Sequence, residues 1–129
     1  MKEIIKELTD NLQIIETFDK DSAQDGHSLH SYLIHLSNIQ ARANFIMADY
    51  KRLIRIEKIK VYDKLVTDYH VGKGYYSPSL AKEYADAKCG EIAYVYDLAE
   101  RLSRSCTHTM DAVRTIISSL KNERTFAGY

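Results

Sequence analysis

Residues 70–78, HVGKGYYSP, hold a helix stop signal and a helix start signal only a few residues apart. Gly72 suits the position just after a helix C-terminus, where the backbone takes a positive φ. Ser77 and Pro78 are typical of an N-cap followed by a first-turn proline. Residues 28–69, before this segment, contain neither Pro nor Gly. Because a short connection makes two helices antiparallel neighbours, the sequence predicts a long antiparallel helical hairpin.

The expected fold class is all-α, with a coiled-coil-like hairpin and a short N-terminal amphipathic helix in a three-helix arrangement. The chain has one Pro and five Gly in 129 residues, which favours few turns and long helices. A hydrophobic content of 45% with 28% charged residues is typical of a folded domain. We expect a single domain, with helices at about 2–18, 28–69 and 78–121, a loop at 19–27, a turn at 70–77 and a tail at 122–129.

Apolar residues at three- and four-residue spacing predict which helix faces are buried. The first helix carries the series Ile4, Ile5, Leu8, Leu12, Ile15 and Phe18. The second follows a heptad-like series of Leu29, Tyr32, Leu36, Ile39, Ala43, Ile46, Tyr50 and Leu53. The third has a stripe of mostly small residues, Ala81, Ala85, Cys89, Ile92, Ala99, Cys106, Val113 and Leu120, which we expect to be widened by Leu80, Tyr84, Ala87, Tyr94, Leu98 and Leu102. Two helices cannot cover such wide faces, so we expect self-association into a homo-oligomer, or docking on a partner.

Charge is unevenly spread along a chain whose formal net charge is zero. Residues 1–27 hold seven acidic and three basic side chains, whereas the second helix carries a basic stretch, Lys51, Arg52, Arg55, Lys58, Lys60 and Lys64. If the hairpin turns near residue 73, residue i faces about residue 146 − i. Two interpretations of the basic stretch follow. It pairs across the hairpin with Glu91, Asp97 and Glu100, or it contacts phosphate groups of a nucleotide or nucleic acid.

Residues 101–114, RLSRSCTHTMDAVR, form the most polar part of the third helix and include Arg101. The same register places Arg104 near Arg42, and His108 near Asn38. With Asn44, these side chains are expected to form one polar cluster at the middle of the hairpin. Such a cluster is either a buried polar layer that fixes the helix register or a binding site for an anion or a partner.

Other candidate residues point mostly to structural roles. Tyr75 and Tyr76 lie in the expected turn beside Lys73, where they either stack on bases, anchor a protein partner or serve the fold. His27 and His30 have a spacing that two metal ligands can have, but no Glu or Cys accompanies them, so we expect no metal and no cofactor. The two cysteines, Cys89 and Cys106, are too far apart on one helix to bridge, and we expect reduced, buried thiols.

Several function classes lack their signatures. The sequence contains no GxxxxGK[ST], GxGxxG or HExxH motif, and no nucleophile with a supporting base, so we do not expect an enzyme. No apolar run reaches the length of a membrane-spanning helix, and the N-terminus lacks a signal-peptide core, so we expect a cytoplasmic protein with no membrane partner.

The stretch YVYDLAERLSRSCTHTMDAVRTIISSLKNER, residues 94–124, resembles small helical-hairpin accessory proteins of phages and prophages. The resemblance rests on Tyr- and Ala-rich spacing followed by a polar segment. It implies a non-enzymatic protein-interaction factor, acting in the host cytosol, that binds or occludes a host or viral protein. Two alternatives stay open: a nucleic-acid or nucleotide binder that uses the basic face, and a structural or scaffold component of a virion.

Overall fold

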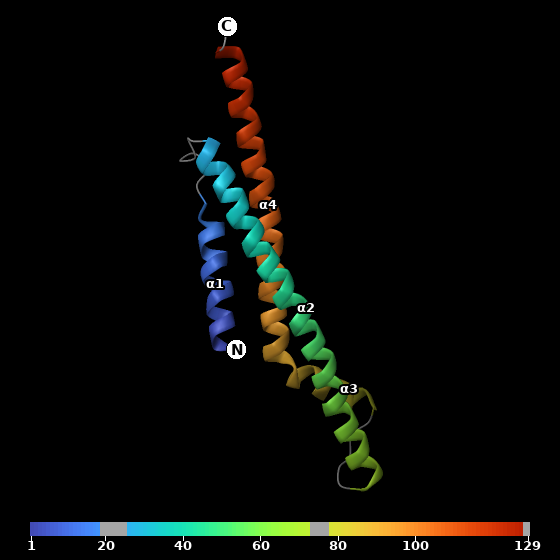
Figure 1. Cartoon of the computed structure of the whole chain (residues 1–129). Helices are drawn as coiled ribbons and strands as arrows, with labels where there is room; N and C mark the ends of the chain where they lie inside the picture. Colours follow the sequence, from blue (N-terminus) through green and yellow to red (C-terminus); the bar gives the residue numbers. More distant parts are fainter. Residues whose placement is uncertain (19–25, 73–77, 128–129) are drawn as a thin grey trace. The chain divides into compact units, whose positions relative to one another are not determined.

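The computed structural model describes residues 1–18, 26–72 and 78–127, and the secondary structure in these ranges is entirely helical. These ranges contain four helices: α1 (Lys2–Glu16), α2 (Gly26–His70), α3 (Pro78–Lys88) and α4 (Gly90–Ala127) (Figure 1). The all-α prediction is therefore confirmed. The described residues form two compact units, and each unit is described below by itself.

The prediction of three helices is wrong, because the third predicted helix is interrupted at Cys89. The Cys89 amide donates to the carbonyls of Ala85 and Asp86, both at 3.2 Å, which closes α3. The Cys89 carbonyl then accepts the first bond of α4 from the Ala93 amide, at 2.8 Å. The next residue, Gly90, has the lowest helix propensity after proline, so the helix breaks where the backbone has least local support. The predicted end is also wrong, since α4 runs to Ala127 rather than to residue 121.

The turn after α2 begins as predicted. Gly72 has a φ of +78°, the left-handed conformation that closes a helix C-terminus without the penalty of a Cβ atom. The Gly72 amide donates to the carbonyl of Tyr69 at 3.2 Å. The predicted N-cap, Ser77, lies outside the described residues.

The first unit comprises residues 1–45 and 98–129, in which α1, the first part of α2 and most of α4 pack together. Its core includes Leu29, Val113 and Ile117, against which Phe18 and Tyr32 pack. The rings of Phe18 and Tyr32 are stacked with centroids 4.9 Å apart. The buried side chains of α1 are Leu8, Leu12 and Ile15, which confirms the predicted face of the first helix.

The second unit comprises residues 46–97, in which α2 packs against α3 and the start of α4. The buried residues include Ile46, Tyr50 and Leu65 of α2 and Ala81 and Ala85 of α3. Cys89 is 1% exposed, and its thiol lies 3.9 Å from the carbonyl oxygen of Ile54. The side chains that α3 buries are thus small, as the stripe of small residues predicts.

The predicted buried faces are largely correct, with one group of exceptions. The small-residue stripe is buried at Ala81, Ala85, Cys89, Ala99, Cys106 and Val113. The expected widening is wrong at Leu80, Tyr84, Ala87 and Tyr94, which are all exposed. The side chains that complete the core of α4 are Val95, Leu102, Met110 and Ile117.

Candidate interaction surfaces

Helix α2 meets α4 in the first unit close to the predicted register. Asn44 accepts a hydrogen bond of 2.7 Å from the Ser103 hydroxyl, where the prediction places residue 102 opposite. The Gln40 amide nitrogen donates to the Ser103 carbonyl at 3.0 Å and to the Thr107 hydroxyl at 2.7 Å. These four residues make a polar seam along the edge of the contact between α2 and α4.

The predicted polar cluster of Arg42, Arg104, His108, Asn38 and Asn44 does not form as one group. Of these residues, only Asn44 joins the polar seam. No polar or charged side chain in the described ranges is buried, so the seam is also not the buried layer that was one of the two interpretations. Gln40 was not among the predicted residues. The predicted register places it across from residue 106, and this position could have indicated its contact with the polar segment of α4.

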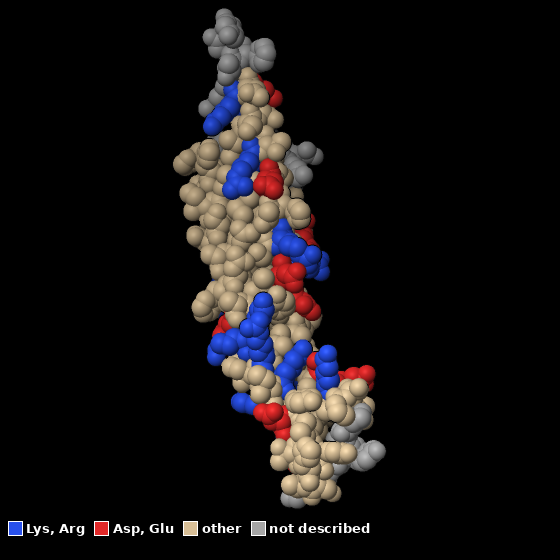
Figure 2. Space-filling view, turned by 90° about the vertical axis from the view of Figure 1, so that its right-hand side faces the viewer, with Lys and Arg blue, Asp and Glu red and all other residues tan. Residues whose placement is uncertain are grey.

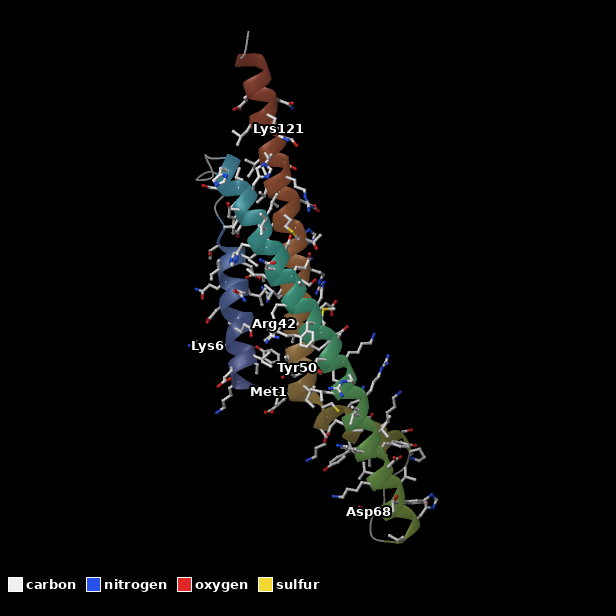
Figure 3. All side chains as sticks on the ribbon, in the orientation of Figure 1. Met1, Lys6, Arg42, Tyr50, Asp68 and Lys121 are labelled. Carbon is white, nitrogen blue, oxygen red and sulfur yellow. The ribbon has the colours of Figure 1, made fainter. Side chains whose placement is uncertain are left out.

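Arg42 of the predicted cluster and Arg101 of the polar segment both bind carboxylates on α1. Arg42 donates to Glu7 through Nε at 3.0 Å and through Nη2 at 3.3 Å, and its side chain is labelled in Figure 3. Arg101 donates to Glu16 at 2.7 and 3.1 Å. Hydrogen bonding to Glu7 raises the pKa of the Arg42 guanidinium. The excess of acids in residues 1–27 was the sequence signal for this pairing.

The remaining arginine of the cluster and its histidine have different surroundings. Arg104 lies 3.9 Å from Glu100 on its own helix, at the limit of an ion pair. His108 lines a shallow hollow of about 280 Å³ in the first unit. The end of α1 contributes one wall of this hollow and α4 the other, through Ile15, Glu16, Phe18, Ser105, His108, Thr109 and Ala112.

The basic stretch of α2 belongs to the second unit and is only partly neutralised. Lys58 binds Asp86 of α3 at 3.0 Å, and Arg52 binds Asp49 of α2 at 3.0 Å. Within the described ranges, no ion pair involves Lys51, Arg55, Lys60 or Lys64. The predicted pairing with Glu91, Asp97 and Glu100 is wrong, since Glu91 and Asp97 make no ion pair with described residues and Glu100 approaches Arg104. Figure 2 shows Lys and Arg side chains gathered together with a few acidic ones.

Two isoleucines lie among these basic side chains. Ile59 is 61% exposed and Ile56 is 37% exposed. On a helix with 3.6 residues per turn, both lie on the side of α2 opposite the buried Tyr50 and Leu65. We define the basic–apolar face as Arg52, Arg55, Ile56, Ile59 and Lys60. Asp49 and Asp63 stand at its two ends.

The remaining candidate residues are the turn tyrosines and the cysteines. Tyr75 and Tyr76 lie outside the described residues. Cys89 and Cys106 are free and buried, as predicted. Burial raises the pKa of the Cys106 thiol to about 11 and also raises the pKa of Cys89. In the part of the chain that the structure describes, no three His, Cys, Asp or Glu side chains come together as metal ligands would.

No described helix has an apolar stretch long enough to cross a bilayer. No protein-family model matches the chain, and no curated protein or solved structure is significantly similar to it.

Proposed function

We propose that this chain is a non-enzymatic helical protein-interaction factor that binds its partner through the basic–apolar face of α2. The observation that supports this most directly is Ile59, which is 61% exposed between the cations of Arg55 and Lys60. Neither cation has an ion-pair partner among the described residues. An apolar centre with a charged rim is the usual composition of a protein-binding surface.

The charge and the apolar side chains of this face indicate what kind of partner surface would bind it. An acidic protein surface with an apolar pocket would neutralise the unpaired cations and remove Ile59 from water. Following the resemblance to phage accessory proteins, we propose a host or viral protein as the partner, which the chain binds or occludes.

Nucleic-acid binding is the second candidate, because the basic stretch that includes this face has four cations, at positions 51, 55, 60 and 64, without an ion pair to a described residue. Phosphate contacts alone do not require the exposed isoleucines. The two candidates therefore predict different effects for a change at Ile59 and for changes at the cations.

The test compares the wild-type chain with three variants in affinity capture from host lysate, read out by mass spectrometry. A specific partner should be captured by the wild-type chain and lost with Ile59→Ser and with Arg55→Glu. Ile14→Ser is the matched control, because Ile14 is 56% exposed on α1 and lies outside the basic–apolar face. Capture that is equal for all variants would contradict the proposed surface.

Binding to short DNA and RNA oligonucleotides at about 50 mM salt tests the second candidate. Nucleic-acid binding should weaken steeply as salt rises, and should depend on Arg55 but not on Ile59. Absence of binding at low salt would exclude it.

A further inference from the structure

A second exposed array lies on the part of α2 that belongs to the first unit, N-terminal in sequence to the basic–apolar face. Ser31, Ile34, Asn38, Ala41 and Phe45 follow each other at alternating spacings of three and four residues, and all five are exposed. We call this array the uncharged stripe. Ile34 and Phe45 are 65% and 63% exposed, the highest values for large apolar side chains among the described residues.

The stripe is free of charge for reasons of sequence and of structure. Residues 26–41 contain no Lys, Arg, Asp or Glu. The next residue, Arg42, is held by Glu7 of α1, while its guanidinium carbon lies 5.9 Å from the centre of the Phe45 ring. A broad area without charged side chains is visible on the face drawn in Figure 2.

The fold of the first unit does not account for this stripe. The α2 side chains that pack into its core are a different series, which includes Leu29, Leu36, Ile39 and Ala43. A single exposed apolar residue is ordinary. Five consecutive positions with heptad spacing and no charge are instead the pattern of a helix–helix seam.

We propose that the uncharged stripe is an interface between two copies of this chain, in which the α2 helices pack antiparallel about a two-fold axis. In such an interface the same patch meets itself, so that if residue i contacts residue j, then j also contacts i. Centring the axis between Asn38 and Ala41 places Ile34 against Phe45 of the second copy, and Phe45 against the second copy's Ile34. Asn38 and Ala41 then meet each other in the two layers nearest the axis.

The side chains favour a second copy in this orientation over other occupants. The large residues Ile34 and Phe45 meet in the two outer layers, and the smaller Asn38 and Ala41 meet in the two inner ones. Ser31 falls opposite residue 48, outside these four layers. The residues that meet in these layers carry no charge, and Arg42, which lies beside Phe45, already has its carboxylate partner in Glu7. A parallel pair would bring the two like-charged Arg42 side chains to the same level. The antiparallel pair instead places each Arg42 at the level of Ser37 of the second copy.

The size of the stripe limits the affinity. From Ser31 to Phe45 a helix rises about 21 Å, so only about four turns of each helix can take part in the contact. We therefore expect a reversible dimer with a dissociation constant on the order of micromolar. This inference does not rest on the proposed partner-binding function, since it uses another segment of α2, which belongs to the first unit.

Sedimentation of the full chain over about 1–100 µM, a range that brackets micromolar affinity, tests the interface. The wild-type protein should shift from monomer to dimer, and Ile34→Glu should raise the dissociation constant at least tenfold. Ile34 is exposed, so the fold should survive the change, which circular dichroism checks. Ile14→Glu, at an exposed position outside the stripe, should leave dimerisation unchanged. A wild-type monomer throughout the range, or equal effects of the two variants, would overturn the proposal.

Disulfide trapping tests the orientation. A mixture of Ile34→Cys and Phe45→Cys chains should form a cross-linked dimer that contains one chain of each kind. The native thiols at Cys89 and Cys106 are buried, and the wild-type chain controls for them. Self-cross-linking of Ile34→Cys alone, at a rate equal to the mixture, would indicate parallel helices and overturn the antiparallel arrangement.

Discussion

Arg42 of α2 donates two hydrogen bonds to the carboxylate of Glu7 of α1, at 3.0 and 3.3 Å. The pair joins the acidic N-terminal helix to an α2 segment that is otherwise uncharged from residue 26 to residue 48. A lone arginine in such a segment has a structural partner, so its presence does not require an external anion.

The energetic contribution of this pair should be small, because the side chains of Arg42 and Glu7 are 47% and 36% exposed. A double-mutant cycle with Arg42→Gln and Glu7→Gln should give a coupling free energy of about 0.3–1 kcal/mol. Urea unfolding at low and high salt measures it, and the coupling should decrease as salt rises. A coupling unaffected by salt would argue that the pair is shielded from solvent.

Docking of α1 should depend on its buried face far more than on its ion pairs. Ile15 is 3% exposed whereas its neighbour Ile14 is 56% exposed. Ile15→Ala should lower the free energy of unfolding by about 2–4 kcal/mol, because it removes buried apolar contact and leaves a cavity. Ile14→Ala should change it by less than about 0.5 kcal/mol. Urea denaturation measures both, and similar losses from the two variants would contradict the observed packing of α1.

Two glycines should respond to alanine with opposite signs. At Gly90 an added Cβ meets no atom within 4 Å and φ is not positive. Gly90→Ala should therefore stabilise the fold by about 0.4–1 kcal/mol through the entropy of the unfolded chain. Gly72 has equal space but a φ of +78°, so Gly72→Ala should destabilise by about 1–2 kcal/mol. Thermal unfolding of both variants checks this, and a stable Gly72→Ala protein would mean that the turn after α2 can relax.

Stability should fall in alkaline solution because of the buried thiol of Cys106. Burial raises its pKa from 9.0 to about 11, so above pH 9 the unfolded chain loses this proton before the folded chain does. The folded state then holds more protons, and the free energy of unfolding decreases as pH rises through this interval. The expected loss between pH 9 and pH 11 is about 2 kcal/mol.

Cys106→Ala separates this effect from other alkaline titrations. The variant should be less stable at pH 8 because it loses buried contacts, yet it should lose less stability than the wild type as pH rises to 11. Urea unfolding under reducing conditions at both pH values gives the comparison. Parallel losses in the two proteins would show that Cys106 does not titrate as the structure indicates.

The sequence by itself determined the helical class, the buried series and the place of the main turn. Periodicity identifies a buried face because every third or fourth residue of a helix points the same way, as Leu8, Leu12 and Ile15 illustrate. Gly72 identified the end of α2 because few other residues tolerate its backbone conformation. The register followed from the position of the turn, and it placed Asn44 within one residue of its observed partner.

Only the tertiary structure decided which polar groups pair and where the third predicted helix breaks. Ion pairs depend on which helix packs alongside, so Arg42 and Arg101 bind Glu7 and Glu16 on α1, and Arg42 does not join the polar cluster expected at the middle of the hairpin. The break at Cys89 depends both on the weak helix propensity of Gly90 and on how the flanking helices pack. The sequence pattern along one helix reports the propensity but not the packing. Exposure at the edges of a buried face also depends on packing: Leu80 and Ala81 were both expected to be buried, but Leu80 is exposed and only Ala81 is buried.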